Sequence, residues 1–96
     1  MIRYYSTNRN LHGVEGIRPF EGRVSFREAL LQGQAPDEGL YMPDRIPAIP
    51  LGKILGCKGN PYREIALLVS WAFLEGEISR EDLKAVVDDA YNFPVP

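Results

Sequence analysis

The stretch Val24–Pro43, V-S-F-R-E-A-L-L-Q-G-Q-A-P-D-E-G-L-Y-M-P, sets the local fold of this chain. Ser25 is a good N-cap, and Glu28 follows at the spacing of a capping box, in which each side chain can satisfy a free backbone amide. Four apolar residues then fall on one helical face or on its margin: Phe26, Ala29, Leu30 and Leu31. The spacing therefore predicts a short capped helix.

The second half of the stretch predicts a stop, a turn and a strand. Gly33 suits the left-handed position that ends many helices. Pro36-Asp37 suits the centre of a type I turn, and Gly39 allows a positive φ just beyond it. Leu40–Met42 reads as a strand ended by Pro43. The stretch predicts a local unit of structure, but its residue types alone indicate no reaction.

Composition restricts the class of protein. The chain has 96 residues, enough for one small domain, and a net charge of −2 with no cluster of Lys or Arg. We therefore expect no nucleic acid and no membrane as partners. Cys57 is the single cysteine, which excludes an internal disulfide framework and fits a reducing, cytoplasmic location. The first residues lack the apolar core of a signal peptide, and no apolar run is long enough to span a bilayer.

Outside that stretch, the first half of the chain shows weaker signals. Ile2–Thr7 is a β-prone run that could form an edge strand. Asn8–Arg23 is rich in Gly, Asn and Pro and reads as a loop or loose hairpin. His12 lies in this loop, where we expect a surface residue, because a metal site needs more ligands than one.

The second half predicts helices. Leu51–Leu55 is expected to form one helical turn, and Asn60 with Pro61 begins a helix over Pro61–Glu75 that Gly76 stops. Within it, Ser70 is the only polar residue between Ile65 and Leu74, whereas a surface helix has one apolar stripe. Either part of this surface covers other segments or meets something outside the chain, or the helix is buried in a four-helix core.

The last helix has a clearer pattern. Ser79 is its expected N-cap, and Asp82 places an acid in the first turn. One buried stripe follows at helical spacing: Leu83, Val86, Val87 and Ala90. Together the elements predict an α+β fold, with short N-terminal β-strands and three to four α-helices packed beside them.

Three groups of residues are candidates for chemistry. Gly52–Gly59 precedes a helix, but Cys57 stands where a Walker loop requires its second glycine, so a plain connector is the simpler interpretation. Cys57 beside Lys58 is likewise an ordinary cysteine in the simpler interpretation. Glu28, Asp37 and Glu38 could supply paired carboxylates, yet capping and turn formation already explain Glu28 and Asp37. We predict no metal site and no catalytic residue in this chain.

The order of these blocks resembles the N-terminal domain of threonine synthase. Arg3–Thr7 resembles the start of that family, and Val24–Pro43 resembles its V-S-F-x-E-A-L-x-x-G-L-A-P-D-G-G-L-Y-x-P signature. Tyr62–Phe93 is similar to the two helices that follow, including the final Ala90-Tyr91. The resemblance covers most of the chain except Asn8–Arg23, which is longer than the usual link.

The resemblance implies that residues 1–96 belong to an enzyme dependent on pyridoxal 5′-phosphate (PLP), with its catalytic domain downstream in the same polypeptide. That enzyme converts O-phospho-L-homoserine and water to L-threonine and phosphate, the last step of threonine biosynthesis. The family's Schiff-base lysine lies in a Phe-Lys-Asp motif, which Lys53, Lys58 and Lys84 do not match. The fragment alone is therefore expected to bind no PLP and to be inactive.

The resemblance also suggests where this domain could meet the substrate. We hypothesise that the Gln34–Tyr41 loop, with Asp37, Glu38 and Gly39 at its tip, faces the catalytic cleft of the whole enzyme. Glu38 stands where the family often has Gly; if that position needs a positive φ, Gly39 could absorb the turn instead. The alternatives are a stand-alone interaction module that uses the Ile65–Leu74 helix, or a threonine synthase-like paralogue with another phosphorylated hydroxy-amino substrate.

Overall fold

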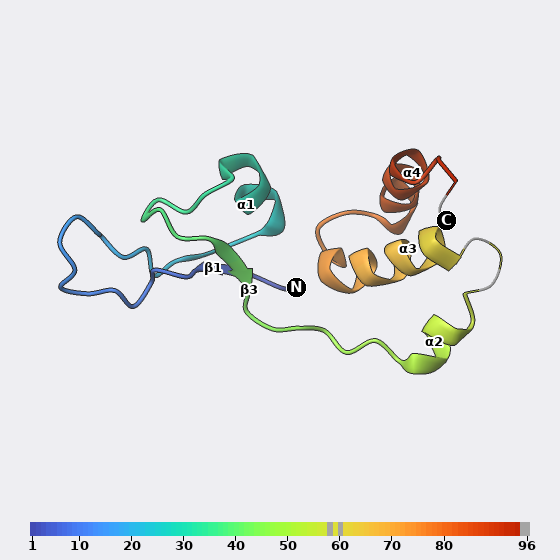
Figure 1. Cartoon of the computed structure of the whole chain (residues 1–96), viewed down its shortest axis with the longest axis horizontal. Helices are drawn as coiled ribbons and strands as arrows, with labels where there is room; N and C mark the ends of the chain where they lie inside the picture. The colour runs from blue at the N-terminus through green and yellow to red at the C-terminus, as the bar shows by residue number, and fades with distance from the viewer. Residues whose placement is uncertain (58, 60, 95–96) are drawn as a thin grey trace. The chain divides into compact units, whose positions relative to one another are not determined.

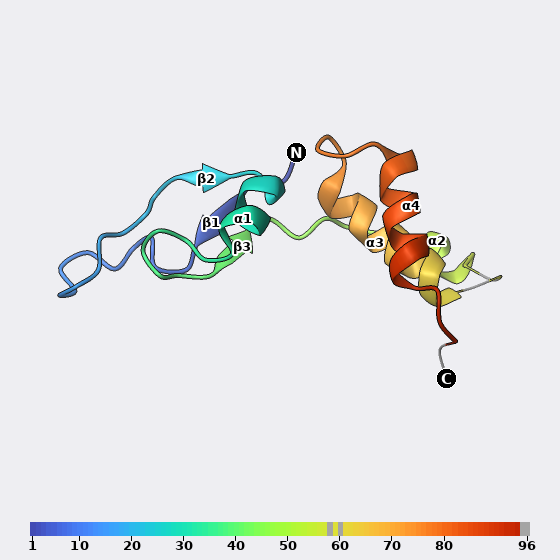
Figure 2. The same ribbon diagram turned by 90° about the horizontal axis from the view of Figure 1, so that it is seen from above.

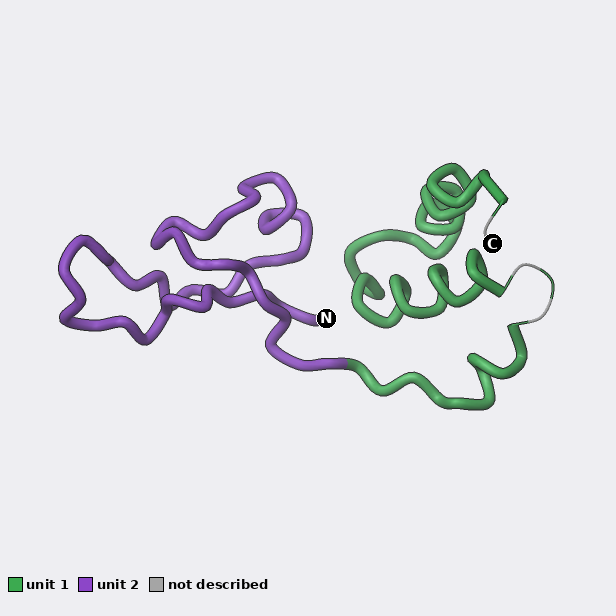
Figure 3. Tube along the Cα trace, viewed as in Figure 1, with its two compact units in different colours: residues 1, 47–96 green, residues 2–46 purple. Residues whose placement is uncertain are grey.

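The computed structural model describes residues 1–57, 59 and 61–94. They fall into two compact units (Figure 3). In chain order we call residues 2–46, purple in the figure, the first unit, and residue 1 with residues 47–96, green in the figure, the second unit. Within the described residues the first unit holds three strands and one helix, and the second holds three helices (Figure 1). The predicted α+β fold with short N-terminal strands is confirmed.

A small antiparallel sheet is the framework of the first unit. Its strands are β1 (Tyr4–Ser6), β2 (Arg23–Val24) and β3 (Tyr41–Pro43), in the order β2-β1-β3. The expectation that the first strand lies at an edge was wrong, because β1 pairs on both sides: Tyr4 lies opposite Val24 on β2 and opposite Pro43 on β3. Strand β2 could not be predicted, because its two residues are too few for any periodic signal in the sequence.

Helix α1 (Phe26–Gln32) lies next to this sheet (Figure 2). Its predicted caps are confirmed, since the Glu28 amide donates to Ser25 Oγ at 3.1 Å and Gly33 ends the helix with φ 75°. Ala29 is buried and the Phe26 ring lies 5.8 Å from that of Tyr4. The other two residues of the predicted apolar face, Leu30 and Leu31, are exposed, because this seven-residue helix packs on the sheet along one edge only.

The second unit contains α2 (Leu51–Leu55), α3 (Pro61–Leu74) and α4 (Arg80–Ala90). The predicted turn of helix at α2 is confirmed. The predicted Gly stop after α3 is also confirmed, with Gly76 at φ 95°, and Ser79 Oγ accepts from the Asp82 amide at 3.1 Å as the cap of α4. Asn60, the predicted cap of α3, lies outside the described residues. None of the described helices is long and apolar enough to cross a membrane.

Helices α3 and α4 pack against each other, but they bury few side chains. On α4, Leu83 and Val87 are buried as predicted, whereas Val86 and Ala90 are exposed, because α3 covers only part of the predicted stripe. Arg63 on α3 links the pair by donating to the Tyr91 carbonyl at 2.8 Å. No described residue of α3 itself is buried, so the alternative in which a four-helix core encloses this helix is wrong.

Candidate functional site

The Gln34–Tyr41 loop is organised by the buried carboxylate of Asp37, which is 4% exposed. The Glu38 amide donates to the Ala35 carbonyl at 2.9 Å, which confirms that Pro36 and Asp37 are the central residues of a turn. This turn delivers the Asp37 side chain to the end of β1, where Ser6 Oγ donates to Oδ1 at 2.5 Å.

Two backbone amides complete the set of donors to this carboxylate. The Phe20 amide donates to Oδ2 at 2.8 Å and the Gly39 amide to Oδ1 at 3.1 Å. In addition, the Asn8 side-chain amide donates to the Asp37 carbonyl at 3.0 Å. Asp37 therefore ties together the end of β1, the 8–23 loop and its own turn, which are far apart in the sequence. We call Ser6, Asn8, Phe20, Asp37 and Gly39 the Asp37 network.

The Asp37 network fixes the ionisation of the carboxyl. Burial raises the pKa of Asp37, but the hydrogen bonds from Ser6, Phe20 and Gly39 together outweigh burial and hold the pKa below its ordinary value. Burial also raises the pKa of Tyr41, and the negative charges of Asp37 and Glu28 raise it further. At neutral pH the loop is thus held by an ionised Asp37 and a neutral Tyr41, whose hydroxyl donates to Gln32 Oε1.

Glu38, and not Gly39, has the positive φ that the sequence analysis expected at Gly39. Glu38 has a φ of 66°, so it occupies the left-handed region, whereas Gly39 is not among the residues with positive φ. The expectation that Gly39 absorbs the turn was therefore wrong. Gly39 is required for space instead: an added Cβ would collide with Ser6 Oγ and would lie 2.9 Å from the Asn8 nitrogen. The turn therefore places its left-handed residue at the position after Asp37.

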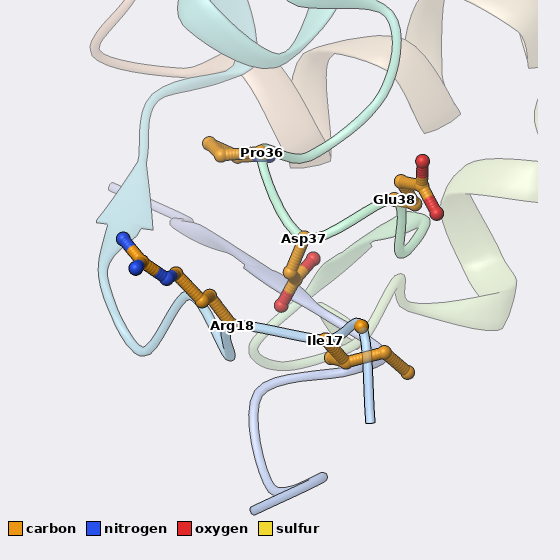
Figure 4. Close-up of a pocket in the computed structure, with 6 residues that line it drawn as sticks. Ile17, Arg18, Pro36, Asp37 and Glu38 are labelled. Carbon is orange, nitrogen blue, oxygen red and sulfur yellow. The ribbon is translucent and has the colours of Figure 1, made fainter. Parts of the chain in front are cut away.

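A shallow polar hollow of about 420 Å³ lies beside this turn. It is lined by Gly16, Ile17, Arg18, Pro36, Asp37 and Glu38. In Figure 4 the Asp37 side chain points toward the segment of Ile17 and Arg18, while the charged ends of Arg18 and Glu38 point away from each other. The hollow therefore offers an exposed cation and an exposed carboxylate on opposite rims, with Asp37 fixed between them as a structural anchor.

The other candidates from the sequence have structural partners. Glu28 Oε1 accepts from Ser25 Oγ at 3.2 Å, so it acts in the helix cap. His12 lies on the surface as predicted, with Nε2 at 3.1 Å from Glu21 Oε1. Cys57 Sγ donates to the Lys53 carbonyl at 3.3 Å. Lys58 lies outside the described residues, and among those described no group of acidic, His and Cys side chains could hold a metal ion.

The described lysines do not fit a covalent PLP site. Lys84 is 61% exposed on α4, with Nζ at 2.7 Å from Asp88 Oδ2. Lys53 is exposed on α2. A lysine that holds PLP needs an enclosed pocket that positions the cofactor, whereas Lys53 and Lys84 line one hollow of about 550 Å³ that is open to solvent.

Ser6, Asn8 and Phe20 are the parts of the Asp37 network that the sequence did not indicate. Ser6 is fully buried, and it meets Asp37 because Ser6 pairs with Tyr41 in the β1–β3 register. Phe20 contributes a backbone amide, which has no signature in the sequence. One signal in the sequence could have linked Ser6 to Asp37. Ser6 is a polar residue near the end of the β-prone run Ile2–Thr7, and Asp37 lies just before the predicted strand Leu40–Met42, with which that run pairs.

Comparison with known proteins points to one family. The family model described as "Threonine synthase N terminus" matches residues 3–91. The threonine synthase of Pseudomonas aeruginosa is 37% identical over 68 residues, which are 71% of this chain and 14% of the relative. That of Schizosaccharomyces pombe is 42% identical over 69 residues, which are 71% of this chain and 13% of the relative.

A solved structure extends the match to three dimensions. The X-ray crystal structure of PLP-bound threonine synthase from Brucella melitensis superposes with a TM-score of 0.73 and 33% identity, covering 96% of this chain and 18% of that chain. The chain thus spans 13–18% of the length of these relatives, so the region that matches is small compared with the proteins that contain it.

Proposed function

This chain belongs to the threonine synthase N-terminal domain family, and from that premise we propose that it is part of a PLP-dependent threonine synthase. The reaction is the conversion of O-phospho-L-homoserine and water to L-threonine and phosphate. The observation that carries the proposal is the match to residues 3–91 together with the fold shared with a PLP-bound threonine synthase. When bound, PLP supplies the electron sink that such a reaction requires.

The division of labour within the enzyme is part of the proposal. We place the residue that holds PLP in a downstream catalytic domain, because the described lysines, Lys53 and Lys84, are exposed and line an open hollow rather than an enclosed pocket. Residues 1–96 alone bind no PLP and have no activity. Their contribution is to present a preformed surface to the catalytic domain and to the substrate cleft.

The cofactor can be tested on the full-length gene product. Absorbance between 300 and 500 nm should show a PLP band that borohydride treatment removes. Mass spectrometry of the reduced protein should then place the PLP-modified peptide beyond residue 96. A colourless protein contradicts the proposal of a PLP enzyme, and a modified Lys53, Lys58 or Lys84 contradicts the proposed division of labour.

The Gln34–Tyr41 loop is proposed to form part of the wall of the substrate cleft. Its support is a polar hollow of about 420 Å³ with two exposed charged rim residues. Glu38 stands on the turn that Asp37 fixes, and Arg18 stands on the loop whose Phe20 amide donates to Asp37. Loops held by a rigid scaffold often carry function. In this proposal Glu38 faces the cleft, and Asp37 acts as a positioning residue through the turn.

Variants of the full-length enzyme test the role of the loop. Glu38→Gln removes a charge at the rim without changing the size of the side chain, and Asp37→Ala removes the anchor. Both should change kcat or KM for O-phospho-L-homoserine, whereas Glu15→Gln, an exposed control in the same unit, should not. Unchanged kcat and KM in both Glu38→Gln and Asp37→Ala would overturn the cleft assignment while leaving the family unaffected.

A further inference from the structure

Helix α3 carries an apolar strip that the described part of the chain leaves partly open. Tyr62, Ile65, Ala66 and Val69 follow each other at i, i+3, i+4 and i+7, so they lie on one line along the helix. Tyr62 is 52% exposed and Val69 37% exposed. We call these four residues the α3 strip. They include no charged side chain, which is unusual for a helix face that meets water.

Aromatic side chains extend the α3 strip at one end. The Tyr62 and Tyr91 rings are 5.3 Å apart, and the Tyr91 and Phe93 rings are 6.3 Å apart. Tyr91 is held in place because Arg63 donates to its carbonyl through two nitrogens, at 2.8 and 3.3 Å. Tyr62, Ile65, Ala66 and Tyr91 together line an apolar hollow of about 370 Å³. An aromatic-rimmed hollow of this kind can receive one apolar side chain of a partner.

The length of the relatives indicates the occupant. The structural match covers 18% of the Brucella threonine synthase chain and the sequence match covers 14% of the Pseudomonas one, so most of each polypeptide lies outside the matched region. A partner in the same chain has a high effective concentration and needs no charge to steer it, which fits a strip without charged residues. Resting on the proposed function, we infer that the α3 strip is the surface on which the downstream catalytic domain docks.

Site-specific photo-crosslinking of the full-length protein tests this inference. Benzoylphenylalanine is placed at position 69, on the α3 strip, or at position 86, where Val86 on α4 is 58% exposed and does not line the hollow. After illumination, position 69 should crosslink to peptides beyond residue 96 of the same polypeptide, and position 86 should not. Crosslinks from position 69 to a second copy, to a separate protein or only to residues 2–46 would overturn the inference, as would no crosslink.

A second measurement does not depend on the unnatural residue. In the full-length protein, Val69→Glu should increase hydrogen exchange of residues 61–74 by roughly tenfold or more, because a charge would be buried in the interface. Val86→Glu should leave that exchange unchanged, which controls for adding a carboxylate to an exposed helix position. Equal exchange in both variants would contradict docking at the α3 strip.

Failure of this inference differs from failure of the proposed function. A full-length protein that binds PLP and forms threonine, but crosslinks from position 69 to no downstream peptide, retains the function and loses the docking surface. A protein without PLP that still crosslinks from position 69 to downstream peptides loses the function and retains the docking surface.

Discussion

The two units of this chain are stabilised in different ways. Residues 2–46 hold five buried apolar residues, Ile2, Tyr4, Val24, Ala29 and Ala35. They also hold a polar centre, in which Asp37 at 4% exposure and the fully buried Ser6 join three segments by hydrogen bonds. Residues 47–94 rely on apolar contacts between helices, yet among the described residues of the helices only Leu83 and Val87 are buried. The first unit therefore specifies its own geometry, whereas the second presents apolar surface that remains available to a partner.

This difference follows from the kind of interaction. A buried carboxylate is costly unless donors surround it, so the Asp37 network is satisfied in one arrangement of the loop. Apolar contacts have no direction, and α3 can therefore pack on α4 and still bind another surface. A directional centre suits a loop that must be held rigidly, and an apolar helix suits a docking face.

The largest effect is expected from removing the anchor of the first unit. Asp37→Ala leaves the Ser6 hydroxyl and the Phe20 amide without their acceptor and should release the turn from β1. Hydrogen exchange of the full-length protein should rise strongly in residues 2–46 and remain unchanged in residues 61–90. An equal rise of hydrogen exchange in both units would contradict their separation. No rise in residues 2–46 would contradict the anchoring role of Asp37.

Gly39→Ala should have the next largest effect. The new Cβ would collide with Ser6 Oγ and lie 3.0 Å from Asp37 Oδ1, and overpacking of this kind costs about 1–3 kcal/mol. Glu38→Gly is the matched control, because φ 66° at this residue favours glycine and its cost should stay below about 1 kcal/mol. Chemical denaturation measures the free energy of unfolding of both variants. If Gly39→Ala lowers it no more than Glu38→Gly does, Gly39 is not required for space.

Acid should weaken the first unit through the same carboxylate. Because the pKa of Asp37 in the folded protein is below its ordinary value of 3.8, its contribution to stability is present above pH 3.8 and is lost as the pH falls through the folded pKa. An acid titration of hydrogen exchange in residues 2–46 should show this loss. Asp37→Asn should flatten that titration; an unchanged acid response in the variant would exclude Asp37 as its source.

The smallest predicted effects compare equivalent caps in the two units. Ser25 caps α1 and Ser79 caps α4, each accepting an amide hydrogen bond at 3.1 Å. Ser25→Ala and Ser79→Ala should each cost about 1 kcal/mol of stability. Hydrogen exchange should respond in α1 for the first and in α4 for the second. A response of both helices to either variant would show that the units unfold together.

What the sequence could predict was mostly local. The caps at Ser25 and Ser79, the glycine stops at Gly33 and Gly76 and the Pro36-Asp37 turn all depend on a few adjacent residues, and all are confirmed. The family was predicted from the similarity of the whole Val24–Pro43 pattern to its signature, since no single motif was specific enough.

The remainder depended on contacts between distant residues. The central place of β1 depends on β2, a two-residue strand without a pattern of its own. The Asp37 network joins residues 31 and 17 positions apart, including a backbone amide that any residue type would provide. The exposure of Leu30 and Val86 could not be read from helical spacing, because spacing identifies a face without showing how much of it a neighbour covers.

An assay of the full-length gene product with O-phospho-L-homoserine would decide whether this chain is part of a threonine synthase. We predict equimolar release of phosphate and L-threonine, with oxygen from labelled water found in the threonine hydroxyl, and loss of both products after borohydride reduction. Absence of threonine from a protein that carries PLP would contradict the proposed reaction and leave this chain as the N-terminal domain of an enzyme with a different substrate.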